Sequence, residues 1–83
     1  MELDIWDDFL TIQFNEDDEV FPKRKAHVRG ECIRKGFLMY GKSMRWIEPE
    51  EKEVCDTEKK ILYQRIKDEC KKQHDLRIEM EIS

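Results

Sequence analysis

The chain has 83 residues, of which 39% are hydrophobic and 43% are charged, and its net charge is −4. A chain of this length has room for one small core, so we expect residues 1–83 to form a single domain. No apolar run approaches the roughly 18 residues that a membrane span needs. The acidic N-terminus also lacks the basic and apolar regions of a secretory signal. We therefore expect a cytoplasmic protein that does not contact a membrane.

The charges alternate in blocks along the chain. Residues 1–20 carry eight acids and no base, whereas residues 21–45 carry eight bases and one acid. Residues 46–58 are acidic again, with six acids and one base. Such blocks are typical of solvated faces that pair across a fold. They also suit an acidic surface that meets a basic partner.

The first half of the chain predicts β-strands. The alternation in "FLTIQF" predicts a half-buried strand over 9–14. The apolar residues within 3–6 either extend that strand or form a short one before it. An acidic loop follows at 15–19, with the composition of a tight turn. Alternation returns in "RKAHVRGECIR" (24–34), where Gly30 marks the expected bulge or register change.

The middle of the chain predicts two further β-segments. "KGFLMYGKSMRWIEP" divides at "GKS" (41–43), which has the length of a hairpin turn, and ends at Pro49. Within the second segment, Trp46 is expected to face the core and Ile47 to face outward, because successive strand residues point to opposite faces.

One long helix is predicted for the second half. The run from Asp56 or Thr57, either of which can cap a helix, to Gln73 contains no Gly or Pro. An apolar stripe at i, i+4 and i+8 must face a sheet, and Arg65 is expected to pair with Glu69 on the solvated side. The stripe consists of Leu62, Ile66 and Cys70.

The chain closes with a predicted strand that has one buried face. Four apolar residues alternate there with charged ones: Leu76, Ile78, Met80 and Ile82. The element order is therefore β-β-β-β-α-β. It predicts an α+β fold, with an antiparallel or mixed sheet of four to five strands and the long helix packed on one face.

The sequence gives little support for a catalytic site, a metal site or a nucleic-acid-binding site. Cys32, Cys55 and Cys70 are too widely spaced for a zinc site, and an odd number of cysteines fits free thiols. "GKS" lacks the upstream glycine of a phosphate loop. The basic stretch 21–45 has aromatic neighbours, but the core needs those aromatics and the whole chain is acidic. We expect a protein that is not an enzyme and binds no metal, cofactor or nucleic acid.

The stretch from Gly36 to Cys70 resembles the immunity protein 74 family of bacterial polymorphic toxin systems. An aromatic strand, a small polar turn, a strand that ends in tryptophan and proline, an acidic loop and a helix follow one another in that pattern. The matching residues are Phe37, Tyr40, Ser43, Met44, Trp46 and Pro49, followed by Glu58 and Lys59 in the helix.

The resemblance implies an antidote that binds and neutralises a cognate toxin domain, often a nuclease. A nuclease holds phosphates in a basic cleft, which an acidic protein can cover. We expect the contact to involve exposed loop acids in three blocks: Asp7 and Asp8; Glu16, Asp17, Asp18 and Glu19; and Glu48, Glu50, Glu51 and Glu53. The alternatives are a phage-type inhibitor or nucleic-acid mimic, and a small adaptor subunit of a larger complex.

Overall fold

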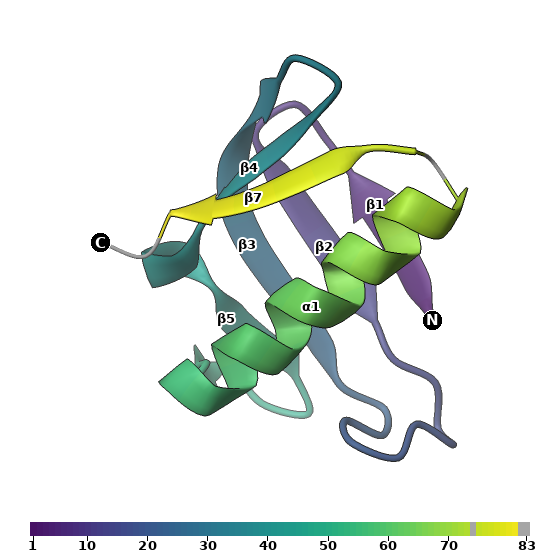
Figure 1. Ribbon diagram of the computed structural model, residues 1–83. Helices are drawn as coiled ribbons and strands as arrows, with labels where there is room; N and C mark the ends of the chain where they lie inside the picture. The colour runs from purple at the N-terminus through teal and green to yellow at the C-terminus, as the bar shows by residue number, and fades with distance from the viewer. Residues whose placement is uncertain (74, 82–83) are drawn as a thin grey trace.

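A computed structural model of the chain describes residues 1–73 and 75–81, so the prediction for Ile82 lies outside the described residues. The predicted α+β fold is confirmed: one helix in the second half of the chain packs against a mixed sheet (Figure 1). The elements are β1 (Glu2–Ile5), β2 (Phe9–Gln13), β3 (Lys25–Ile33), β4 (Gly36–Tyr40), the 3₁₀ helix η1 (Gly41–Ser43), β5 (Arg45–Glu48), β6 (Lys52–Glu53), α1 (Asp56–Gln73) and β7 (Arg77–Glu81).

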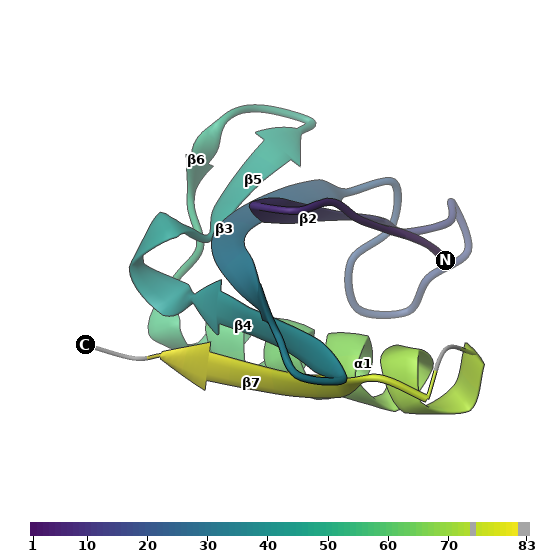
Figure 2. The ribbon, with the colours of Figure 1, turned by 90° about the horizontal axis from the view of Figure 1, so that it is seen from above.

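The sheet is strongly curved because β3 belongs to two layers. The first half of β3 pairs with β2 and β5, and its second half pairs with β4, all antiparallel. Figure 2 shows β3 curving from the layer of β2 and β5 into the layer of β4 and β7. The change of partner falls at Gly30, where a Cβ atom would lie 2.0 Å from the Leu38 carbonyl oxygen. The irregular register itself lies between Lys25 and Ala26 instead of at Gly30.

The expected hairpin at 41–43 is wrong. These residues form η1, and β4 and β5 pair with different parts of β3 instead of with each other. The Ser43 hydroxyl holds the turn, since it donates to the Tyr40 carbonyl (2.7 Å) and accepts from the Arg29 N–H (2.8 Å). The turn therefore moves the chain from one layer to the other.

The helix closes the open side of the curved sheet. Its predicted stripe of Leu62, Ile66 and Cys70 is buried, and β7 returns beside it to pair in parallel with β4. The core between helix and sheet contains Leu10, Ile12, Phe14, Phe21, Ala26, Val28, Phe37, Met39, Met44, Trp46, Val54, Leu62, Ile66, Cys70 and Ile78. Among the described residues, no helix is both long enough and apolar enough to cross a membrane.

The helix begins one residue earlier than predicted. Cys55, instead of Asp56 or Thr57, occupies the cap position, because its carbonyl accepts the N–H of Lys59 (2.8 Å). Its own N–H donates to Glu58 Oε1 (3.3 Å), which is one half of a capping box.

All three cysteines are free, and burial raises the pKa of the Cys70 thiol to about 11.

Candidate functional site: an acidic end of the sheet

Two of the three predicted acid blocks lie at the same end of the molecule. Gln13 at the end of β2 pairs with Lys25 at the start of β3, and Lys25 pairs with Glu48 at the end of β5. The β2–β3 loop and the β5–β6 turn therefore leave the sheet side by side, at the lower edge of Figure 1. We call residues 15–20 and 47–53 the acidic end.

Most carboxylates of the acidic end face solvent. Glu16 lies 3.7 Å from Lys23, and Glu51 lies 3.1 Å from Arg45, in pairs that are exposed to water. Exposed pairs of this kind contribute little to stability. Five other acids make no ion pair with any residue of 1–73 or 75–81: Asp17, Glu19, Glu48, Glu50 and Glu53. These carboxylates are available to a partner.

Asp18 does not belong with the exposed acids, and its assignment as one is wrong. Its side chain is only 11% exposed and accepts two hydrogen bonds from Arg65, at 2.6 and 3.1 Å. It also accepts the backbone N–H groups of Val20 (3.0 Å) and Phe21 (2.8 Å). Arg65 turns toward this loop and covers the Phe14 ring at 4.8 Å. Its predicted pair with Glu69 is thus replaced by a contact that holds the β2–β3 loop against α1.

The hydrogen bonds from Arg65 hold the pKa of Asp18 well below its usual range, although burial works in the opposite direction. In an unfolded chain the pKa of an aspartate is about 3.9. Folding lowers that pKa, so the contribution of the pair is complete above about pH 5 and is lost progressively as the pH falls below it. Protonation of Asp18 therefore weakens the attachment of the loop in acid.

Replacing Asp18 with asparagine is expected to lower the free energy of unfolding at pH 7 by about 1–3 kcal/mol, because Arg65 loses a charged partner. The exposed neighbour Asp17 provides the control, because Asp17→Asn should change the free energy of unfolding by less than about 0.5 kcal/mol. Urea denaturation at pH 7 and pH 3 measures both. The two substitutions should differ clearly at pH 7 and by a smaller margin at pH 3, where part of the contribution of Asp18 has been lost. Equal effects at pH 7 would contradict the structural role of Asp18.

Asp7 and Asp8 lie at the opposite end of β2 from the other two acid blocks. They occupy the turn between β1 and β2, which the Trp6 N–H closes by donating to the Phe9 carbonyl (2.8 Å). The Asp8 carbonyl accepts the N–H of Gly30 (3.0 Å), where β3 leaves the first layer. The candidate site therefore retains the two blocks of the acidic end, without Asp18.

Glu58, Trp46 and Arg24 together anchor the acidic end. The sequence alone did not single out these three residues as a group. Glu58 accepts the Trp46 indole N–H (3.2 Å) through Oε1 and the Arg24 guanidinium (3.2 Å) through Oε2. Arg24 in turn lies 5.0 Å from the Trp46 ring. Burial alone would raise the pKa of Glu58, but hydrogen bonds from Trp46 and Cys55 outweigh it and lower that pKa. The ends of β3 and β5 are thereby fixed to the first turn of α1.

Two exposed apolar side chains accompany the acids. Val20 in the β2–β3 loop is 51% exposed, and Ile47 on β5 is 39% exposed. Trp6 is exposed as well, but it lies beside the turn of Asp7 and Asp8. The acidic end thus combines carboxylates with two exposed apolar side chains on a fixed support.

No metal centre is apparent in the part of the chain that the structure describes: no group of three or more His, Cys, Asp or Glu side chains is arranged to hold an ion. Comparison of the chain with protein families, curated proteins and solved structures finds no match.

Proposed function

We propose that this protein is the antidote of a bacterial toxin and neutralises its cognate toxin domain by covering a basic cleft with the acidic end. The observation that carries the proposal is the convergence of two acidic loops at one end of a single sheet, with five carboxylates that have no ion-pair partner among the described residues. A basic cleft that holds phosphates, as in a nuclease, is the complementary surface.

The support beneath these loops favours tight binding. The Asp18–Arg65 pair fixes one loop to α1, and Glu58 fixes the strand ends next to the other. A surface that is already ordered loses less conformational freedom on association, which leaves more of the interaction free energy for affinity. The exposed side chains of Val20 and Ile47 supply apolar surface that becomes buried when a partner binds.

The charge of the acidic end favours fast binding. A patch of one sign attracts a partner of the opposite sign during diffusion and raises the association rate by about 10- to 1,000-fold at low salt. Speed matters for an antidote, since the toxin acts on the cell until it is bound. The proposal is of a cytoplasmic binding protein that needs no metal or cofactor and carries out no reaction of its own.

Co-expression with a candidate cognate toxin domain tests this function. Cells that produce the toxin domain alone should stop growing, and cells that also produce this protein should grow as the uninduced culture does. The purified pair should form a 1:1 complex, with a catalytically inactive toxin variant used to obtain the protein. Growth arrest that continues despite abundant folded protein, with no complex on size-exclusion chromatography, would contradict the proposal.

A further inference from the structure

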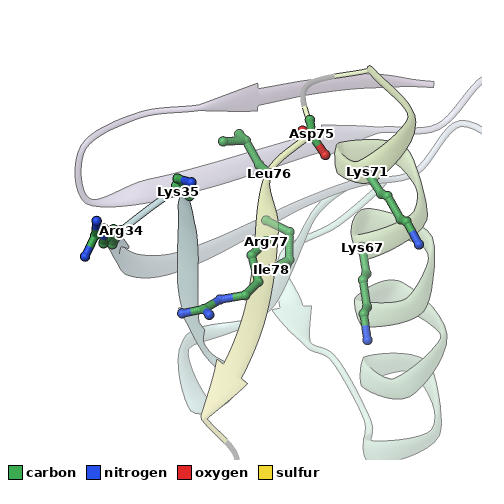
Figure 3. Close-up of a pocket in the computed structure, with 8 residues that line it drawn as sticks. All are labelled: Arg34, Lys35, Lys67, Lys71, Asp75, Leu76, Arg77 and Ile78. Carbon is green, nitrogen blue, oxygen red and sulfur yellow. The ribbon is translucent and has the colours of Figure 1, made fainter.

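A pocket of about 520 Å³ lies between the second half of α1, the start of β7 and the β3–β4 turn (Figure 3). Its volume falls within the range of small-molecule sites. Basic side chains come from three sides: Arg34 and Lys35 from the turn, Lys67 and Lys71 from α1, and Arg77 from β7.

The fold fixes the walls of this pocket through the backbone. The Leu76 N–H donates to the Cys70 carbonyl (3.2 Å), and the Arg77 N–H donates to the Lys35 carbonyl (2.9 Å). Gly36 pairs with Arg77, and a Cβ atom at Gly36 would lie 1.9 Å from the Arg77 carbonyl oxygen. The turn, the strand and the end of the helix are therefore joined in one fixed arrangement, although they lie far apart in the sequence.

The pocket concentrates positive charge in an acidic protein. Five of its lining side chains are cationic and only Asp75 is anionic, whereas the whole chain carries a net charge of −4. Four of the cations make no ion pair within residues 1–73 and 75–81: Arg34, Lys35, Lys67 and Lys71. Arg77 has one long contact of 3.8 Å with Glu79, between two exposed groups.

The position of the cations is not explained by the helix alone. Basic side chains near the C-terminus of a helix offset its dipole, which accounts for Lys71. That effect does not account for Arg34, Lys35 and Arg77, which lie on other elements. An anionic ligand in the pocket would interact favourably with these cations.

We propose that this pocket binds a polyphosphate group, either free or as part of a nucleotide. Guanidinium and ammonium groups are the side chains that bind phosphate oxygens best. The half-buried Leu76 lines the pocket among these cations and gives an apolar surface for a base. This site lies away from the acidic end, since β3 starts at the acidic end and finishes at Ile33, directly before Arg34. Its occupancy does not depend on the proposed antidote function.

Calorimetric titration of the full chain with ATP and with tripolyphosphate tests the proposal. The variant Lys67→Gln/Lys71→Gln removes two pocket cations. The control Lys60→Gln/Lys72→Gln removes the same charge from exposed positions of the same helix that do not line the pocket. The pocket variant should bind at least about tenfold more weakly than wild type, because charge-assisted contacts are lost. The control should stay within about twofold, as a change in overall charge is largely screened.

The two ligands separate the possible sources of the phosphate. Tighter binding of ATP assigns the site to a nucleotide, and equal binding assigns it to free polyphosphate. Amide shifts of the wild-type protein on titration with ATP should centre on the β3–β4 turn and the start of β7. The proposal is overturned if wild type shows no saturable binding, if both variants weaken it equally, or if a single-stranded oligonucleotide binds more tightly through residues outside the pocket.

Discussion

Replacing Trp46 with alanine is expected to lower the free energy of unfolding by about 3–5 kcal/mol, which is most of the stability of so small a domain. Trp46 is fully buried, and its ring lies 4.9 Å from that of Phe21 and 6.5 Å from that of Phe14. The substitution also leaves Glu58 without the indole N–H that it accepts. A cavity in the core, together with the loss of one of the three hydrogen bonds that Glu58 accepts, explains the size of the expected loss.

The adjacent residue provides the control. Ile47 is 39% exposed on the opposite face of β5, so Ile47→Ala should lower the free energy of unfolding by less than about 1 kcal/mol. Urea denaturation followed by circular dichroism measures both variants. A loss at Trp46 no larger than the loss at Ile47 would mean that β5 does not pack on α1 as described.

Charge reversal at the acidic end is expected to slow association with the proposed toxin domain by about tenfold or more at low salt. One variant changes Glu16, Asp17 and Glu19 to lysine and leaves Asp18, which the loop needs. The other changes Glu50, Glu51 and Glu53 to lysine. All six side chains are exposed, so thermal melts should stay close to wild type. Stopped-flow measurements at several salt concentrations should show a weaker salt dependence for both variants.

A matched variant separates local charge from net charge. Reversing Asp4, Asp7 and Asp8 to lysine changes the net charge equally, but these exposed acids lie on β1 and on the turn at the other end. Association of this variant should remain within about threefold of wild type. If all three variants associate at the same rate, the toxin domain is recognised elsewhere and the acids serve only solvation.

Local periodicity predicted the parts of the fold that bury one face. The stripe of Leu62, Ile66 and Cys70 and the alternation over 9–14 each correspond to an element in the structure. Pairing between strands that are distant in the sequence was harder to predict from local patterns. Nothing near "GKS" indicates that the strands on either side join different halves of β3, because that depends on the curvature of β3 at Gly30.

Prediction of the candidate site from the sequence meets the same limit. Glu16, Asp17, Asp18 and Glu19 look alike in the sequence. Asp18 is distinguished by its contact with Arg65, 47 residues away, and by the backbone N–H groups of Val20 and Phe21. The separation of Asp7 and Asp8 from the acidic end follows from topology. Successive turns of antiparallel strands lie at opposite ends of a sheet, so the β1–β2 turn and the β2–β3 loop cannot meet. That inference needed only the correct assignment of β1.

Hydrogen exchange of the complex with the inactive toxin domain tests most directly whether the acidic end is the contact surface. Amides within 15–20 and 47–53 should exchange more slowly in the complex than in the free protein, because a bound partner excludes water from both loops. Amides of the β1–β2 turn should exchange at the same rate in both states. Slowed exchange confined to α1 and β7, with both acidic loops unchanged, would contradict the assignment of the acidic end as the site of neutralisation.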